Sequence, residues 1–349
     1  MSGFLFCFLP PSQLPAEVEA GCRMYREEAI QGKGVGCLAT RDIEPGVLVV
    51  REAPCLYIDP EEAGQGGSVL KRTITAFINM NKEDKTQYME LSNMFDRSPE
   101  EWSVTARKDM KTMKQELNGL ILTRISVEEA VKVWQIKITN SFHNGVCLKI
   151  SRFNHSCWPN AEYFWNSDTK TRDVRSVAKI TQGDEISLDY RRLWTLTRRQ
   201  RRKCLKEDFN FDCCCLGCVR DEKYIQEENQ MCESFVLLHN EHQTIENTTQ
   251  DELMRVVSIL KDMYKLAKSM KIIKQSLILN FIVEDWFVTS CVGLKNAANE
   301  TEANTCSENI QQSLLIGIAL SNMLYGSNYS SSEKWRNRES NLAENKQTN

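Results

Sequence analysis

The stretch Arg152–Asn160, with the sequence RFNHSCWPN, decides the fold of this chain together with two blocks that follow it. The block GDEISLDY occupies residues 183–190, and the block CCCLGC occupies residues 213–218. Each block by itself is only weakly specific, because short polar or cysteine-rich runs occur in many proteins. Their order and spacing along one chain are far more specific, so the three blocks are interpreted together.

The cysteine run predicts a metal centre. Cys213, Cys215 and Cys218 supply three thiolates close together in the sequence. Structural zinc takes four nitrogen or sulfur ligands in a tetrahedron, so a fourth ligand must come from elsewhere. Cys214 would point away from its two neighbours in an extended segment, yet a ligand set that includes Cys214 stays open. The alternative is a group of ordinary buried thiols, although packing alone explains so dense a run poorly.

Composition excludes several classes of protein. The 349 residues carry a net charge of only −3, which gives no bulk electrostatic case for nucleic-acid binding. The 14 cysteines do not suit a disulfide framework, since four of them crowd into six residues. The apolar stretch 4–9 lacks a preceding basic residue and a cleavage site, so no signal peptide is expected. The apolar region 277–294 is broken by Glu284 and Asp285, which favours a buried helix over a membrane span. We therefore expect the protein in the cytoplasm, the nucleus or both.

The first 218 residues combine β-structure with a helical insert. Residues 33–52 alternate apolar and polar positions around a Pro-Gly turn signal, and a similar pattern returns at 174–190. We predict two hairpins in a compact sheet assembly. Between them, 68–139 carries apolar residues at helical spacing. Ser126 followed by Glu129 is a helix-start signal within this insert.

The β-signal disappears after residue 218. Thr249 and Glu252 form a second helix-start signal ahead of a long apolar stripe. Two further helices are predicted over 276–294 and 309–324. The last twenty residues are polar and are predicted to be disordered.

The three blocks, together with a glycine-rich turn at 32–36, resemble a SET domain and its post-SET zinc site. The resemblance is nearest to SET-and-MYND (SMYD) proteins, but 56–135 contain neither cysteine nor histidine, so we expect the MYND zinc finger to be absent. It implies an α+β fold: a β-rich SET domain with a pseudo-knot and a helical insert, a post-SET zinc lobe and a helical C-terminal region. The expected units are an N-terminal extension (1–20), the SET domain (21–194, with its insert at about 57–135), the post-SET segment (195–220), the helical region (221–329) and the tail (330–349).

The resemblance also implies the site residues. The cysteine after Asn154-His155-Ser156 would be the fourth zinc ligand, so the implied metal set is Cys157, Cys213, Cys215 and Cys218. Tyr190 would be catalytic. The residues expected to bind the cofactor S-adenosylmethionine are Lys33, Gly34, Gly36, Asn140, Ser151, Asn154, His155, Tyr190 and Phe211. Taken singly, most of these residue types would be caps or packing residues, and only their joint order favours a site.

The implied activity is methyl transfer from S-adenosylmethionine to a lysine side chain of a histone or another protein, with structural zinc. A lysine amine titrates near ~10.4 and must lose its proton before it can attack. An apolar channel lowers that pKa, and the hydroxyl of Tyr190 would orient the amine. Positioning would supply most of the rate gain.

Two alternatives stay open. A non-catalytic SET module could bind a protein partner and keep zinc for folding, and such a scaffold has no need of the cofactor. A methyltransferase for another acceptor, such as histidine, is the second, because acceptor choice depends on pocket shape. The helical C-terminal region is a further place where a protein partner could bind.

A basic run lies between the SET-like blocks and the cysteines. Residues 198–203 read RRQRRK, and Arg191-Arg192 precede them. A nuclear-localisation or nucleic-acid patch is one interpretation. The solvated face of a helix that leads into the zinc site is the favoured one.

Overall fold

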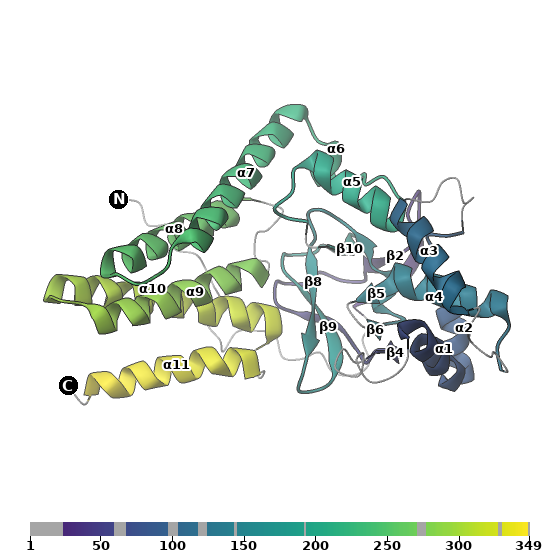
Figure 1. Cartoon of the computed structure of the whole chain (residues 1–349), viewed down its shortest axis with the longest axis horizontal. Helices are drawn as coiled ribbons and strands as arrows, with labels where there is room; N and C mark the ends of the chain where they lie inside the picture. The colour runs from purple at the N-terminus through teal and green to yellow at the C-terminus, as the bar shows by residue number, and fades with distance from the viewer. Residues whose placement is uncertain are drawn as a thin grey trace.

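The computed structural model describes residues 24–58, 68–96, 104–117, 124–142, 145–191, 193–270, 277–326 and 330–347. The predicted N-terminal extension lies outside these residues. Three layers follow one another across the molecule: the helical insert, a β-rich centre, and the C-terminal helices on the opposite side (Figure 1). The architecture is α+β, as the sequence predicts.

Three small sheets form the centre. Their strands are β1 (Tyr25–Ile30), β2 (Gly34–Ala39), β3 (Leu48–Glu52), β4 (Leu56–Tyr57), β5 (Ser141–Phe142), β6 (Gly145–Val146), β7 (Asn154–His155), β8 (Ala161–Asn166), β9 (Thr171–Ser176) and β10 (Glu185–Leu188). The strand orders are β1-β2-β10-β7, β3-β9-β8 and β4-β6-β5. In the first sheet β7 runs parallel to β10, with Asn154 opposite Ser187. This pairing brings the first two sequence blocks side by side.

The prediction of two hairpins is wrong. Strand β2 pairs with β1 and β10, whereas β3 pairs with β9, so the Pro-Gly turn passes from one sheet to another. The two similar segments instead contact each other, because Ile43 and Ile180 form an antiparallel bridge. Gly46 and Gly183 have φ values of 87° and 90°, a region that glycine adopts without steric cost. The repeated pattern therefore marks two matching corners of the sheet assembly.

The helical insert covers one side of the centre. It consists of α1 (Val69–Asn79), α2 (Lys82–Met89), α3 (Val104–Leu117) and α4 (Val127–Asn140). The predicted start at Ser126 is confirmed, since its side chain accepts a hydrogen bond from the backbone N–H of Glu129 at 3.1 Å. The buried apolar faces of this layer form a core of their own around Tyr88, Val133 and Ile136.

The post-SET segment and the C-terminal region are helical. Their helices are α5 (Arg198–Phe209), α6 (Leu216–Val219), α7 (Glu222–Thr244), α8 (Gln250–Ser269), α9 (Leu277–Asn296), α10 (Glu300–Tyr325) and α11 (Ser330–Gln347). The capping box at Thr249 and Glu252 is confirmed. One apolar core runs from the cysteines of the post-SET segment through α7 to α10. Within the part of the chain that is described, none of the helices combines the length and apolar character that a membrane span needs.

The tail differs from the prediction of disorder. Helix α11 spans Ser330–Gln347 and lies along the outer side of the C-terminal helices (Figure 1). Its described contacts combine one buried tryptophan with ion pairs of Lys334 and Arg338 to Glu284 of α9. Trp335 is 1% exposed and packs edge-on against Phe287 of α9 at 5.6 Å between ring centroids.

Gly317 of α10 makes the space for this tryptophan. A Cβ atom at Gly317 would lie 2.6 Å from the Trp335 ring. We expect Gly317→Ala to lower the free energy of unfolding by about 1–2 kcal/mol, because the overpacking exceeds the gain in helix propensity. Thermal unfolding followed by tryptophan fluorescence checks this. The control is Leu315→Ala, a 65% exposed position on the same helix. An unchanged melting temperature for Gly317→Ala would contradict the packing described here.

Candidate active site and metal centre

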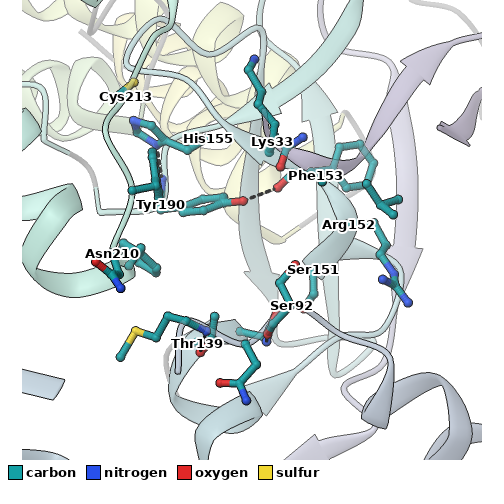
Figure 2. A pocket seen from close by; sticks show the side chains of 18 of the residues that line it. Lys33, Ser92, Thr139, Ser151, Arg152, Phe153, His155, Tyr190, Asn210 and Cys213 are labelled. Atoms are coloured by element: carbon teal, nitrogen blue, oxygen red, sulfur yellow. Dashed lines mark hydrogen bonds between the residues drawn. The ribbon is translucent and has the colours of Figure 1, made fainter. Parts of the chain in front are cut away.

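A cavity of about 450 Å³ lies where the central sheets, the helical insert and the post-SET segment meet. Five segments distant in sequence line it: 32–35, 92–94, 139–142, 151–155 and 206–215, with Tyr190 added from the end of β10. Figure 2 shows Tyr190 above and Thr139 below the open space, with Asn210 on one side and Ser151 on the other. Most of the sequence-predicted cofactor residues are therefore neighbours of one cavity.

Tyr190 is held at both its backbone and its side chain. Its hydroxyl donates to the carbonyl oxygen of Phe153 at 2.8 Å, and its backbone N–H donates to Nδ1 of His155 at 3.2 Å. Burial, reinforced by the nearby carboxylate of Glu185, raises the pKa of the Tyr190 phenol above its ordinary value. The phenol is therefore neutral at physiological pH. Its oxygen keeps lone pairs available to a group in the cavity.

Asn154 is oriented by an acidic residue that the sequence analysis missed. Its Nδ2 donates to Oε1 of Glu185 at 2.9 Å, and Oε2 of the same carboxylate pairs with Nζ of Lys33 at 2.6 Å. Burial by itself would lower the pKa of Lys33, but the hydrogen bond and charge of Glu185 raise it. Lys33 lines the cavity, as expected, yet its ammonium is bound to Glu185. Its side chain therefore acts on Asn154 through Glu185.

Gly36 does not line the cavity, unlike Lys33 and Gly34. It lies behind Asn154 on β2, and an added Cβ would stand 2.6 Å from Nδ2 of Asn154 and 2.4 Å from Ile30. The expected direct role of Gly36 in cofactor contact thus differs from its place in the structure. Its missing side chain makes room for the Asn154 amide.

We expect Gly36→Ala to weaken S-adenosylmethionine binding about 10-fold or more, because the methyl group must displace the Asn154 amide. Isothermal titration measures the dissociation constant. Gly32→Ala is the matched control on the same turn. Its φ of 76° strains an alanine, but its Cβ would meet nothing within 4 Å. Equal losses in both variants would point to turn strain and contradict a role for the Asn154 position.

His155 connects Tyr190 to the cysteine cluster. The ring is buried, and Nε2 lies 3.3 Å from Sγ of Cys157. Nδ1 accepts the hydrogen bond from Tyr190, so the neutral ring carries its proton on Nε2 and donates it toward the sulfur. Both ring nitrogens of His155 thereby have a partner within the protein. Any contact of this residue with a cofactor would come from its backbone, as the resemblance implies.

The remaining predicted residues border the same cavity, but they differ in which atoms they leave available to a ligand. Asn140 donates both amide hydrogens, to Ser92 O at 2.7 Å and to Ile136 O at 2.9 Å, so only its oxygen is left for a ligand. The hydroxyl of Ser151 has no hydrogen-bond partner among the described residues. Phe211 is partly buried, with its ring centroid 6.0 Å from that of His155. Its edge of the cavity suits a flat aromatic group.

Several lining residues were not predicted from the sequence. Ser92, Asn93 and Met94 lie in the loop after α2, and Thr139 ends α4. No local signal distinguishes these residues, because they face the cavity only through the packing of the insert. Asn210 differs, because an asparagine at the end of a helix is a known stop signal. In the structure it is the C-cap of α5, with φ of 58°.

Four buried cysteines converge at the other side of His155. The Sγ atoms of the group all lie within 4.8 Å of one another; its members are Cys157, Cys213, Cys215 and Cys218. Sγ of Cys157 is 3.9 Å from that of Cys213 and 3.6 Å from that of Cys218. Tetrahedral zinc with bonds of about 2.3 Å requires sulfur separations of about 3.8 Å. The donor set therefore fits zinc, with the ligands that the resemblance implies.

The four thiols interact with one another. Hydrogen bonds among them lower the pKa of Cys215 and of Cys218 and raise the pKa of Cys157 and of Cys213. Cys214 is exposed and lies outside the group. The alternative ligand set that includes Cys214 is thus not the one the structure assembles.

The comparisons with known proteins agree with the geometry. A family model described as "SET domain" matches residues 34–191. The matched residues are thus similar to a SET domain. Histone-lysine N-methyltransferase set5 of Schizosaccharomyces pombe is 26% identical over 203 residues, which are 58% of this chain and 53% of that protein. Mouse histone-lysine N-methyltransferase Smyd1 is 30% identical over 90 residues, 23% of this chain and 18% of that protein.

Among solved structures, the SET domain of LSMT bound to lysine and AdoHcy aligns with a TM-score of 0.43 and 12% identity, over 93% of this chain and 89% of that one. The chain spans about half the length of set5. The match to the SET model covers Tyr190 and the cavity segments 34–35, 92–94, 139–142 and 151–155. The cysteines of the cluster other than Cys157 follow it in sequence.

Proposed function

We propose that this protein transfers a methyl group from S-adenosylmethionine to a lysine side chain of a protein, with zinc as a structural ion. One observation carries the proposal. Tyr190, Asn154 and Phe211 border one cavity within and beside the SET domain, and the cysteine cluster ties the segment carrying Phe211 to the segment carrying Asn154. The relatives named above as histone-lysine N-methyltransferases support the same class of acceptor.

Different residues of the cavity would bind the cofactor and orient the acceptor amine. Bound S-adenosylmethionine would supply an electrophilic methyl group on a sulfonium. The Asn154 amide, held by Glu185, and the oxygen of Asn140 would bind the polar end of the cofactor, and Phe211 would stack on its adenine. The neutral hydroxyl of Tyr190 would accept a hydrogen bond from the acceptor amine and orient its lone pair toward the methyl carbon. Exclusion of water by the aromatic walls would favour the uncharged amine.

The experiment that tests the proposal has two stages. Isothermal titration of zinc-loaded protein with S-adenosylmethionine should give micromolar or tighter binding, about −8 kcal/mol. Labelled cofactor is then incubated with histones and with a nuclear and cytoplasmic protein mixture, and mass spectrometry locates the modified residue. Methylation on lysine supports the proposal.

Two results would replace it. Folded, metallated protein that binds no cofactor would favour a non-catalytic scaffold that keeps zinc for folding. Methylation on histidine or another side chain would keep the cofactor site and change the acceptor class. The two alternatives are separable because the first fails at titration and the second only at mass spectrometry.

We also propose a cytoplasmic or nuclear location. All cysteines among the described residues are free, although several are buried beside one another. Reduced thiols on this scale are typical of those compartments. Fluorescence microscopy of the tagged full chain would test the location.

A further inference from the structure

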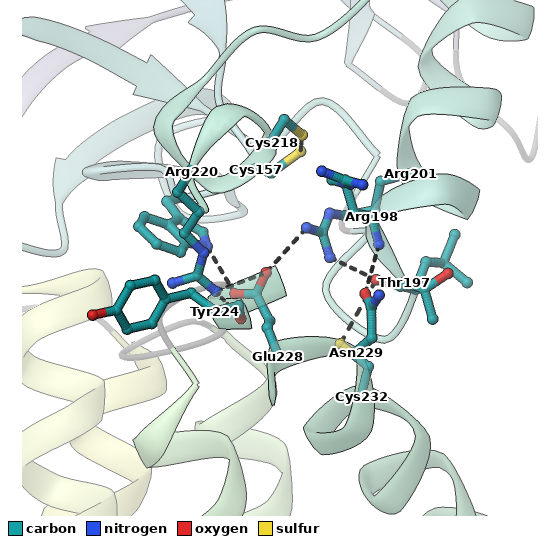
Figure 3. A network of polar contacts seen from close by, with 12 residues as sticks. Cys157, Thr197, Arg198, Arg201, Cys218, Arg220, Tyr224, Glu228, Asn229 and Cys232 are labelled. Carbon is teal, nitrogen blue, oxygen red and sulfur yellow. Dashed lines mark hydrogen bonds and ion pairs between the residues drawn. The ribbon is translucent and has the colours of Figure 1, made fainter. Parts of the chain in front are cut away.

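A buried ion network lies beneath the cysteine cluster. Arg201 of α5 donates from Nη2 to Oε2 of Glu228 at 3.1 Å and from Nη1 to Leu196 O at 2.7 Å. Its side chain has no exposed surface, and Glu228 is 4% exposed. The same carboxylate pairs with Arg220 at 3.5 Å and accepts a hydrogen bond from the indole of Trp158 at 2.9 Å. Figure 3 shows Glu228 at the centre of these contacts.

The burial of Arg201 contradicts one sequence-based interpretation. The basic run was expected to be a solvated helix face, and its neighbours Arg199 and Arg202 are indeed exposed. Arg201 instead points into the protein, because α5 packs this side against α7. A guanidinium without solvent requires compensation by negative charge.

Glu228 alone does not provide that compensation. One carboxylate faces two guanidinium groups, so the network carries a net charge of +1. Arg220 keeps 21% of its side chain exposed and stacks on Trp158 at 4.3 Å, so solvent and the indole stabilise it. Arg201 has neither form of support. Its Nε is buried and has no hydrogen-bond partner among the described residues.

The missing negative charge lies in the metal site. Four thiolates on a divalent zinc ion carry a net charge of −2. Trp158, the residue after Cys157, donates its indole N–H to Glu228, the carboxylate that pairs with Arg201. The ring of Trp158 also packs against Gly217, the residue before Cys218. Burial by itself would lower the pKa of Arg201, but the negative charges of Cys157, Glu228 and Cys218 together raise it. The thiolate cluster and the guanidinium of Arg201 therefore stabilise each other electrostatically.

We propose that Arg201 is the charge-compensating residue of the zinc site and that Glu228 of α7 competes with the thiolates for its positive charge. The guanidinium offsets part of the negative charge that four thiolates leave around zinc. Glu228 pairs with the same cation and connects the metal site to the C-terminal helices. This role concerns retention of the metal, so it does not depend on methyl transfer.

The proposal predicts effects of opposite sign for the two partners. Arg201→Met removes the cation while keeping apolar bulk, so zinc should leave the site faster. Glu228→Gln keeps the shape of the side chain and removes a competing anion, so the cluster should retain zinc at least as well as the original protein. A network that serves only to pack α5 against α7 would accelerate zinc release in both variants.

The experiment measures zinc release from the full zinc-loaded chain to a chromogenic chelator. We expect Arg201→Met to release zinc about 10-fold faster and Arg201→Lys, which keeps the charge, to lie between Met and the original. Arg198→Met is the matched control one turn away, since Arg198 pairs with Glu222 at a part-exposed site. Its release rate should not change.

Either of two outcomes would overturn the proposal: an unchanged rate in Arg201→Met, or faster release in Glu228→Gln. Circular dichroism and the zinc content of each purified variant establish that folded protein is compared. Should Arg201→Met fail to fold, Glu228→Gln still decides, because faster zinc release from that variant contradicts the expected order.

Discussion

Tyr190→Phe is expected to lower the rate of methyl transfer by about 10²-fold or more while leaving cofactor affinity nearly unchanged. The phenol is the neutral hydroxyl at the wall of the cavity, and its loss removes the group that would orient the acceptor amine. Since the same hydroxyl donates to Phe153 O at 2.8 Å, the variant should also lose about 1 kcal/mol of stability. Turnover is measured with labelled S-adenosylmethionine and the acceptor found by mass spectrometry.

The matched control is Tyr57→Phe. Tyr57 is 41% exposed and stacks on Trp165, so its hydroxyl is remote from the cavity. Turnover in that variant should equal the original. A Tyr190→Phe enzyme with an unchanged kcat would remove Tyr190 from the reaction, and one that no longer bound the cofactor would assign it to binding.

Cys215→Ser is expected to abolish zinc binding and to destabilise the protein by several kcal/mol. Structural zinc contributes roughly 10–16 kcal/mol in small zinc-binding peptides, and metal binding there is folding free energy. For a chain of this length, a loss of about 5 kcal/mol would lower the melting temperature by roughly 7 °C. Cofactor binding should weaken as well, because Phe211 precedes Cys213 by two residues. Metal analysis, thermal unfolding and titration measure the three effects.

Cys214→Ser provides an unusually close control. The two cysteines are adjacent in sequence, yet Cys214 is exposed and Cys215 belongs to the cluster. Cys214→Ser should keep its zinc and its melting temperature. Zinc loss from Cys214→Ser with retention in Cys215→Ser would overturn the ligand set described here.

Local sequence predicted much of the secondary structure because its causes are local. The capping residues Ser126 and Thr249 accept the hydrogen bonds expected of them from residues three positions on. The apolar stripe behind Thr249 is the buried face of α8. These features depend on the spacing of residues within one turn or one helix, which any sequence displays directly.

Strand partners and the tail could not be predicted in this way. A turn signal between two strands says that the chain changes direction, but not whether the strands pair with each other. Here Gly46 turns the chain from one sheet to the next. Helix α11 has a polar composition, and it is held by Trp335 over Gly317 and by ion pairs of Lys334 and Arg338 with Glu284. The residue pattern within one segment shows neither the strand that it will pair with nor the helix that it will pack against.

The sequence by itself determined the class of the fold, the four cysteines of the metal site and the tyrosine of the cavity, because order and spacing of those residues carry the resemblance to SET domains. The tertiary structure alone decided what each side chain contacts. It bound Lys33 to Glu185, placed Gly36 behind Asn154 and buried Arg201 against Glu228. Those contacts join residues far apart in the chain, and only close packing of separate elements fixes which charge or amide each one meets.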